Sequence, residues 1–366
     1  MAQRGLLAQP RKILVRATNW IGDAVISLPA LEALRARFPE AEIALVAKPW
    51  VSDIYRHHPA FDRLILYDPE GKHRGIAGFA KLIHELREEQ FDTAVLLQNA
   101  FHAAWMAWRA RIPERIGYAR DGRERLLTRS PEAPPPAAYV HQAYYYLHLL
   151  FRAGIIERPE PPRPLEQVRL TVQHEEKNWA LRRLEALGLH GPRFLIGIVP
   201  GASFGPAKRW PAQRFAELAD RLIAALSADA LIFGAPAERD LAEEVAQEME
   251  HTPVVVAGET TLRQAMALLE NCRLVVTNDS GPMHVAAALA LPVVAVFGPT
   301  DASATGPLGP YARVVQYQVE CSPCGFRSCP IDFRCMENVS VDMVHRAGLE
   351  LIKRLGVKHD RPAPQL

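Results

Sequence analysis

Residues 278–286 constrain the fold of this chain more than any other segment, because they connect two runs that are apolar on both faces. Residues 273–277 have the sequence Arg-Leu-Val-Val-Thr, and residues 292–297 have Pro-Val-Val-Ala-Val-Phe. Such runs are typical of central strands in a parallel sheet. The connecting residues, Asn-Asp-Ser-Gly-Pro-Met-His-Val-Ala, pass from a polar turn into a helical pattern. We therefore predict a strand, a turn and a helix at the carboxyl edge of a doubly wound sheet, where this architecture binds ligands.

This turn also predicts an anion site. The first turn of a helix has backbone N–H groups without intrahelical partners, and it carries the positive end of the helix dipole. The turn at 278–286 is therefore a candidate for binding a nucleotide diphosphate.

Apolar runs alternate with helical patterns along most of the chain, which predicts an α/β protein built from βαβ units. The first half has expected strands near 12–16, 43–46, 63–67 and 93–97, and the second half repeats the alternation up to a final helix near 341–355. We place Pro29 in the first turn of the first helix, where its missing N–H does no harm. The proline-rich stretch 159–164 is interpreted as a linker. A chain of 366 residues then forms two Rossmann-like domains, residues 1–165 and 166–366.

Composition excludes several classes of protein. The net charge of +2 does not indicate a nucleic-acid-binding protein. No apolar run reaches the roughly 18 to 20 residues that span a bilayer, and the first ten residues lack the apolar centre of a signal peptide. The five cysteines are an odd number, which favours a reducing compartment over a disulfide framework. We expect a cytoplasmic protein.

Two common nucleotide motifs are missing from the sequence. No two glycines are two residues apart, so the dinucleotide fingerprint is absent, and no phosphate-binding G-x-x-x-x-G-K loop occurs. No two aspartates are separated by a single residue, so the Asp-x-Asp pair that would hold a divalent metal under a sugar nucleotide is also absent. These absences favour a reaction that uses helix ends and lysine without a catalytic metal.

Asp23 follows the first strand and its loop, at the start of the first helix. One interpretation is structural, since aspartate is a good helix cap. The other is catalytic, because partial desolvation beside a substrate can raise the pKa of a carboxyl group from about 4 toward a useful value for a general base. Position alone does not decide between them.

The segment 200–211, Pro-Gly-Ala-Ser-Phe-Gly-Pro-Ala-Lys-Arg-Trp-Pro, follows the first strand of the second half. Its small residues allow a close approach of the backbone to a ligand. Lys208 and Arg209 add positive charge, which would stabilise a leaving diphosphate in a cleft with little water; a surface loop with two incidental basic residues is the alternative. Glu238 ends the next strand, where a carboxylate can accept hydrogen bonds from ribose hydroxyls.

Seven arginines lie between residues 109 and 129, with only three acidic residues among them. This edge could attract an anionic partner, or it could be a solvated loop. A second cluster holds four thiols within fifteen residues, Cys321, Cys324, Cys329 and Cys335. A structural zinc site, an iron–sulfur loop, reduced thiols and redox chemistry all remain open, because the spacing matches no standard zinc finger.

Five segments, in this order, resemble the ADP-heptose:lipopolysaccharide heptosyltransferases (glycosyltransferase family 9). They are Asn-Trp-Ile-Gly-Asp-Ala at 19–24 with Ser-Leu-Pro-Ala-Leu at 27–31, Arg-Ile-Gly-Tyr at 115–118, the segment 200–211, Phe-Gly-Ala-Pro at 233–236, and Thr-Asn-Asp-Ser-Gly-Pro-Met-His at 277–284. The Asn-Trp-Ile-Gly-Asp and Pro-Ala-Lys-Arg-Trp-Pro forms, together with the late cysteines, most resemble the heptosyltransferase II group. The match extends from about residue 12 to about residue 350.

The resemblance implies a GT-B fold, in which two Rossmann-like domains face each other across a cleft, and an inverting transfer without a metal. It implies ADP-heptose as the donor and a lipid A-linked inner-core oligosaccharide as the acceptor, met by peripheral contact at the inner face of the inner membrane. Asp23 becomes the candidate base and Lys208 the diphosphate clamp. The other donor residues are Ser203, Glu238, Asp279, Ser280, Gly281 and His284. On the acceptor side lie Asn19, Trp20, Arg115, Tyr118 and Arg120, with Arg123 and Arg125 as further candidates.

The resemblance leaves two alternatives. One is another heptosyltransferase of the same family, of the I or III type, with a different core acceptor. The other is a nucleotide-binding or metal-binding module without transfer activity. Asp23 argues against the second alternative, because a binding module has no need of a carboxylate opposite a phosphate site.

Overall fold

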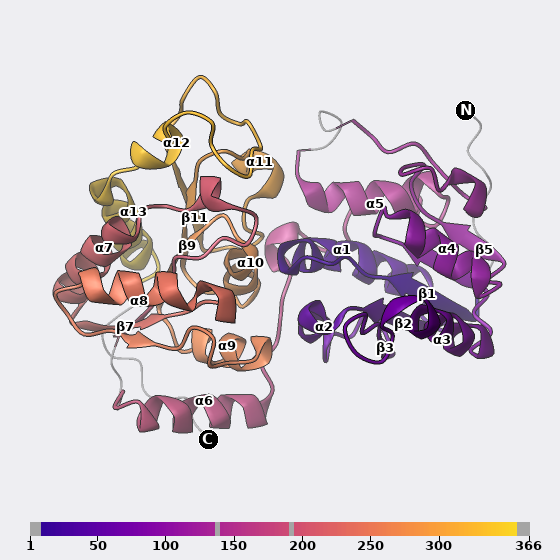
Figure 1. Cartoon of the computed structure of the whole chain (residues 1–366), viewed down its shortest axis with the longest axis horizontal. Helices are drawn as coiled ribbons and strands as arrows, with labels where there is room; N and C mark the ends of the chain where they lie inside the picture. The colour runs from indigo at the N-terminus through magenta and orange to yellow at the C-terminus, as the bar shows by residue number, and fades with distance from the viewer. Residues whose placement is uncertain (1–8, 136–139, 190–193, 357–366) are drawn as a thin grey trace. The chain divides into compact units, whose positions relative to one another are not determined.

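A computed structural model describes residues 9–135, 140–189 and 194–356 of the chain. The chain divides into two compact units, Met1–Val168 and Arg169–Leu366. Each unit is a parallel sheet with helices on both faces (Figure 1). In the described part of the chain, no helix has both the length and the apolar character needed to cross a bilayer.

The N-terminal unit has a five-stranded sheet in the order β3-β2-β1-β4-β5, with all neighbours parallel. Its strands are β1 (Lys12–Arg16), β2 (Glu42–Ala47), β3 (Arg63–Leu66), β4 (Thr93–Leu96) and β5 (Glu114–Ile116). Its helices are α1 (Ile21–Arg37), α2 (Pro49–Tyr55), α3 (Gly75–Glu88), α4 (Phe101–Arg109) and α5 (Gln142–Arg152).

Burial explains the layers of this unit. The strand residues Leu14, Val46 and Leu96 form one buried cluster with Leu82 of α3 and Ala104 of α4, so these helices cover one face of the sheet. Helix α1 contacts both α2 and α5, and these three helices lie together on the other side. Because both faces are covered, the central strands β1, β2 and β4 are buried along almost their whole length, as expected for a parallel sheet.

The C-terminal unit has a six-stranded parallel sheet in the order β11-β10-β9-β6-β7-β8. Its strands are β6 (Phe194–Val199), β7 (Ala228–Ile232), β8 (Val254–Val255), β9 (Leu274–Asn278), β10 (Val293–Phe297) and β11 (Ala312–Gln316). Its helices are α6 (His174–Ala186), α7 (Ala212–Leu226), α8 (Arg239–Glu248), α9 (Leu262–Leu269), α10 (Gly281–Ala288), α11 (Ala302–Thr305), α12 (Arg334–Glu337) and α13 (Val341–Arg354).

One buried cluster joins this sheet to α7, α8 and α13, through Ile198, Phe215, Val245 and Leu351 among others. Helix α9 contacts α6 and α10, and α10 contacts β9 and β10. The two groups of helices therefore sandwich the sheet.

Both sheets are wound in the same way. The chain starts in the middle, at β1 or β6, moves outward on one side, and then returns to the other side of the starting strand at β4 or β9. The place where the strand order reverses is the usual ligand position of such sheets. The predicted α/β fold with two Rossmann-like sheets is confirmed.

Some local expectations were wrong. Pro29 lies inside α1, which begins at Ile21, and not in its first turn. The described elements that were not anticipated from sequence include α4, β5, α6, β11 and the short helices α11 and α12. Strand β5 has only three residues, and β11 is an edge strand with exposed positions, so neither has the buried apolar run that identified the central strands.

Candidate functional site

The central contact of the C-terminal unit joins the loop after β6 to the end of β9, at the point where the strand order reverses. Lys208 Nζ lies 2.6 Å from Asp279 Oδ2, and the two side chains are only 12% and 5% exposed. Thr300 Oγ1 donates a hydrogen bond to the same carboxylate oxygen. The ammonium group is therefore fixed at the carboxyl edge of the sheet by a buried counterion.

Asn278 holds the two ends of the loop that carries Lys208. Its side-chain Nδ2 donates to the carbonyl oxygen of Pro200 at 2.7 Å, and its Oδ1 accepts from the backbone N–H of Trp210 at 3.1 Å. Trp210 is itself buried and donates its Nε1–H to the carbonyl of Val339 at 2.9 Å. Sequence reasoning missed Asn278 as a positioning residue; its place as a polar residue at the end of an apolar strand was the available signal.

The loop is shaped by close packing. Gly205 has φ 157°, and a Cβ there would lie 2.3 Å from the carbonyl oxygen of Arg327, so glycine is required. Lys208 Nζ lies 4.9 Å from the centre of the Phe204 ring, and the Arg327 guanidinium lies 5.4 Å from the same ring. Two cations thus flank one aromatic ring beside the Lys208–Asp279 pair.

Glu238 lies beside the start of this loop. A Cβ on Gly201 would lie 2.3 to 2.6 Å from the carboxyl atoms of Glu238, so the glycine makes room for the carboxylate. Glu238 Oε2 accepts the backbone N–H of Ala235 at 3.0 Å. Ser203 is exposed on the same loop.

The strand–turn–helix at 278–286 is confirmed as β9 followed by α10. Ser280 is the N-cap of α10, and its Oγ lies 3.3 Å from Thr277 Oγ1. Gly281 opens the helix, and His284 is buried in its first turn. The predicted donor residues therefore come together at the carboxyl ends of β6, β7 and β9.

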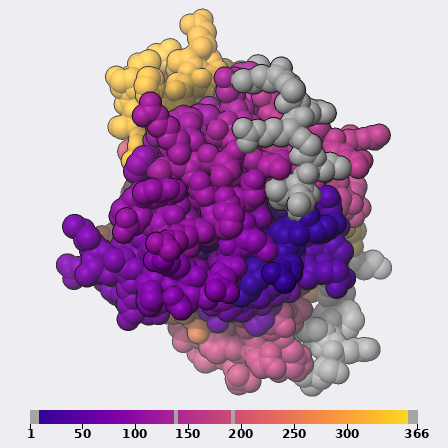
Figure 2. Space-filling view, turned by 90° about the vertical axis from the view of Figure 1, so that its right-hand side faces the viewer, coloured from indigo at the N-terminus to yellow at the C-terminus, as the bar shows by residue number. Residues whose placement is uncertain are grey.

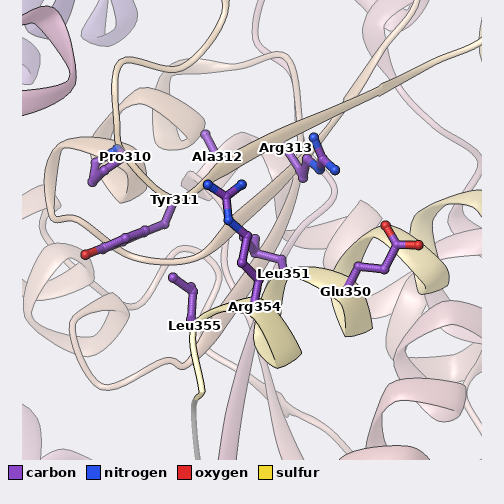
Figure 3. Close-up of a pocket in the computed structure, with 8 residues that line it drawn as sticks. All are labelled: Pro310, Tyr311, Ala312, Arg313, Glu350, Leu351, Arg354 and Leu355. Carbon is purple, nitrogen blue, oxygen red and sulfur yellow. The ribbon is translucent and has the colours of Figure 1, made fainter.

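A surface pocket elsewhere in this unit does not involve these residues (Figure 3). Its lining includes Tyr311 and Arg313 at the start of β11 and Glu350 and Arg354 from α13. This pocket is at the amino end of a parallel strand, whereas ligands in such sheets bind beyond the carboxyl ends. The edge formed by β6 and β9 is therefore the candidate ligand site of this unit.

The cysteine cluster does not form a metal site in the described residues, among which no group of three or more His, Cys, Asp or Glu side chains is arranged to hold an ion. All four thiols are free; Cys321 and Cys324 are exposed, and Cys335 is buried. Cys329 Sγ accepts the backbone N–H of Phe333 at 3.3 Å, and backbone hydrogen bonds lower the pKa of this thiol. The expectation of a structural zinc ion is not supported.

In the N-terminal unit, Asp23 is the third residue of α1, whose N-cap is Trp20 (Figure 2 shows this unit in indigo to magenta). Asp23 therefore lies in the first turn of α1 and is not its N-cap. Burial raises the pKa of both Tyr55 and Tyr146, and the negative charge of Asp23 raises them further. The carboxylate is thus partly buried in the first turn of a helix, at its positive end.

Asn19 and Trp20 precede α1, and Trp20 is exposed. Asn19 is held from two sides, because its Oδ1 accepts from Arg16 Nη2 at 2.9 Å and its carbonyl accepts from Trp50 Nε1 at 2.9 Å. These contacts fix the backbone of the loop that leads to Asp23.

The other predicted acceptor residues differ in accessibility. Arg115 donates to the carbonyl oxygens of Leu126, Ile112 and Pro113, and Tyr118 is buried and donates its hydroxyl to the carbonyl of Tyr145 at 2.7 Å. These contacts favour a structural role for both residues, so their acceptor role stays a prediction. Arg120 and Arg125 are exposed, whereas Arg123 is buried and donates to backbone and Asn99 oxygens.

Comparison with known proteins identifies one consistent group of relatives. Residues 79–333 match glycosyltransferase family 9 (heptosyltransferase). The chain is similar to lipopolysaccharide heptosyltransferase 2 of Escherichia coli (strain K12), with 35% identity over 310 residues, or 83% of this chain and 88% of the relative. It is similar to lipooligosaccharide heptosyltransferase 2 of Haemophilus influenzae, with 33% identity over 309 residues, 83% of this chain and 88% of the relative. The structure of Escherichia coli ADP-heptose lps heptosyltransferase II matches with a TM-score of 0.80 and 31% identity, over 94% of this chain and 99% of that one.

Proposed function

The chain belongs to glycosyltransferase family 9, the heptosyltransferases, and we propose that it moves L-glycero-D-manno-heptose from ADP-heptose to the heptosyl-Kdo2-lipid A inner core of lipopolysaccharide. This is the reaction of a heptosyltransferase II. Its two parallel-sheet units have the GT-B fold. The observation that carries the proposal is the buried Lys208–Asp279 pair, which fixes a cation at the edge where a nucleotide diphosphate binds.

The C-terminal unit binds the donor in this proposal. When the bond between the heptose anomeric carbon and the diphosphate oxygen breaks, negative charge grows on the departing ADP. Lys208 stabilises that charge, and it needs no reorganisation because Asp279 already holds it in place. The N–H groups at the start of α10 add partial positive charge to the same phosphates. Glu238 accepts hydrogen bonds from the ribose hydroxyls.

The N-terminal unit binds the acceptor, and Asp23 is the base. Its carboxylate takes the proton of an acceptor heptose hydroxyl while the hydroxyl oxygen forms a bond to the anomeric carbon of the donor. Attack comes from the face opposite ADP, which leaves with the electron pair of the broken bond, so the anomeric configuration is inverted. Helix α1 supports the assignment, because its first turn holds the carboxylate at a fixed position.

The proposal requires no catalytic metal, since the lysine and the helix end neutralise the leaving group. Activity that is unchanged after treatment with a chelator supports this part, and activity restored only by a divalent cation contradicts it. Because the acceptor is anchored by lipid A, we place the enzyme at the cytoplasmic face of the inner membrane, in peripheral contact with lipid. Cosedimentation with vesicles that contain the acceptor tests that location.

The acceptor assay tests the function directly. Purified protein receives ADP-heptose with either Kdo2-lipid A or heptosyl-Kdo2-lipid A, and mass spectrometry detects added heptose. We expect transfer to the acceptor that already carries one heptose. Transfer only to the acceptor without heptose would identify a different heptosyltransferase of the family, and transfer to neither would contradict the proposed reaction.

A further inference from the structure

A buried arginine lies at the end of β1, and no carboxylate of the described residues pairs with it. Arg16 is fully buried, and its three hydrogen bonds go to neutral oxygens: the carbonyls of Ala17 and Val46 and the side chain of Asn19. Its Nε atom is buried and has no hydrogen-bond partner. Burying a guanidinium group without an anion is costly, so this arrangement needs an explanation.

Two further basic residues follow β2 and β4, the strands on either side of β1. Lys48 directly follows β2, which pairs with β1 so that Arg16 lies opposite Val46. Its Nζ lies 4.7 Å from the Trp50 ring centre, and Trp50 in turn donates to the carbonyl of Asn19. Lys48 is therefore linked through Trp50 to Asn19, the residue to which Arg16 also donates a hydrogen bond.

His102 approaches from α4, the helix that follows β4. Aromatic contacts link it to Arg16: the guanidinium lies 5.7 Å from the Tyr67 ring, Tyr67 lies 5.7 Å from Phe79, and Phe79 lies 6.5 Å from His102. The three basic groups thus follow β1, β2 and β4 at one carboxyl edge, on both sides of the strand-order reversal.

The electrostatics of this cluster are unbalanced. Burial lowers the pKa of Arg16 to about 10. The pKa of Lys48 is lowered by burial and then by the charge of Arg16, while exposed Glu70 acts in the opposite direction. The pKa of His102 is lowered by burial and then by Arg16 and Lys48. An anion placed between these groups would relieve all three effects.

We propose that Arg16, Lys48 and His102 form an anion subsite that binds an acidic group, carboxylate or phosphate, of the acceptor saccharide. Lys48 and His102, which are partly exposed, contact the anion, and Arg16 lies behind them as a fixed charge that also positions Asn19. Exposed Trp50 provides an apolar surface for a sugar ring beside the charge. This inference rests on the proposed function, because it assigns part of the acceptor to the N-terminal unit.

The test uses Lys48→Gln, because Lys48 is partly exposed whereas Arg16 is part of the core. The matched control is Lys72→Gln, which removes an exposed lysine paired with Glu85 in the same unit. Both variants and the unmodified protein are assayed with native acceptor, with acceptor whose carboxyl groups are methyl esters, and with dephosphorylated acceptor. The readouts are KM for each substrate and calorimetric Kd for each acceptor.

We expect Lys48→Gln to raise the Kd and KM for native acceptor about tenfold, the loss of a charge-assisted hydrogen bond, with the KM for ADP-heptose unchanged. The unmodified protein should bind either the methyl-ester acceptor or the dephosphorylated acceptor about tenfold more weakly than native acceptor. Lys48→Gln should not weaken binding of that modified acceptor any further. That acceptor identifies carboxylate or phosphate as the bound group. An unchanged Kd for native acceptor, or an equal loss on all three acceptors, overturns the subsite. Because Kd is measured without turnover, failed transfer by the unmodified protein would count against the proposed function alone.

Discussion

In each unit a cation lies near the point where the strand order reverses, and among the described residues only the cation of the C-terminal unit has a carboxylate counterion. In the C-terminal unit, Lys208 is paired with the buried carboxylate of Asp279. In the N-terminal unit, Arg16 is bonded only to neutral oxygens. Both stand at the reversal of strand order in sheets with the same winding.

This difference indicates what each edge can bind. A cation that already has a carboxylate partner keeps its position without a ligand, and it gains most from a ligand with more charge than one carboxylate, such as a diphosphate. A cation without a partner carries an electrostatic cost in the free protein, which any single acidic group can reduce. The paired site therefore suits the donor, and the unpaired site suits an acidic acceptor.

The largest expected effect comes from Asp23, a carboxylate in the first turn of α1. We predict that Asp23→Asn lowers turnover by about two to four orders of magnitude, the range for the loss of a general base. ADP affinity should be unchanged, because the donor residues belong to the other unit. Asp53→Asn is the control, since Asp53 lies on α2 and pairs with exposed Arg56. Turnover close to normal would remove Asp23 from the mechanism.

Lys208→Ala should have the next largest effect. Removing a preorganised group that stabilises developing charge costs about 100-fold in turnover, and ADP affinity should fall as well because the ammonium also contacts the ground-state diphosphate. Stopped-flow or steady-state kinetics and ADP calorimetry measure the two effects. Lys177→Ala removes an exposed lysine paired with Glu270 and serves as control. If both turnover and ADP affinity stay normal, the paired cation is structural and the comparison of the two edges fails.

The donor edge could largely be predicted from the sequence, because its parts are local. Apolar runs identify β9 and β10, and glycine and proline mark the turn between β9 and α10 and the loop after β6. The sequence could not provide the contacts between Asn278 and the loop after β6. Asn278 is 68 residues from Trp210 and 78 residues from Pro200. Such contacts depend on the order of strands, which no local pattern specifies.

The acceptor edge was predicted less well for the same reason. Arg16 ends an apolar strand and has the pattern of an ordinary strand end. Its contacts come from elsewhere in the chain, from Val46 of β2 and from Tyr67, which follows β3. Arg115 and Tyr118 were chosen from a motif, but their polar groups are bonded within the unit. Helix α4, which carries His102, begins after an alanine N-cap and so lacks a sequence signal for its start.

A smaller effect is expected from Asn278→Ala, which tests whether the paired site depends on its anchored loop. The change leaves the buried N–H of Trp210 and the carbonyl of Pro200 without their partner, at a cost of about 1–3 kcal/mol in the free energy of unfolding. Thermal unfolding should show a lower Tm, and the KM for ADP-heptose should rise because Lys208 is less well positioned. Asn271→Ala, which removes one partly exposed helix-end hydrogen bond, is the control. An unchanged Tm and KM would mean that the loop keeps its shape without Asn278.

The smallest expected effect is that of Arg120→Ala, which compares the exposed arginine edge with the buried cluster around Arg16. Exposed charges contribute little and are screened by salt, so acceptor affinity should fall by about two- to fivefold at low ionic strength and by less at about 0.15 M. The effect of Lys48→Gln should persist at the higher salt, because its site is partly buried beside Arg16. Calorimetry of both variants at two salt concentrations makes the comparison. If Arg120→Ala weakens binding more than Lys48→Gln does, and the loss resists salt, the acceptor is recognised at the exposed edge, and the missing counterion of Arg16 must have a structural explanation instead.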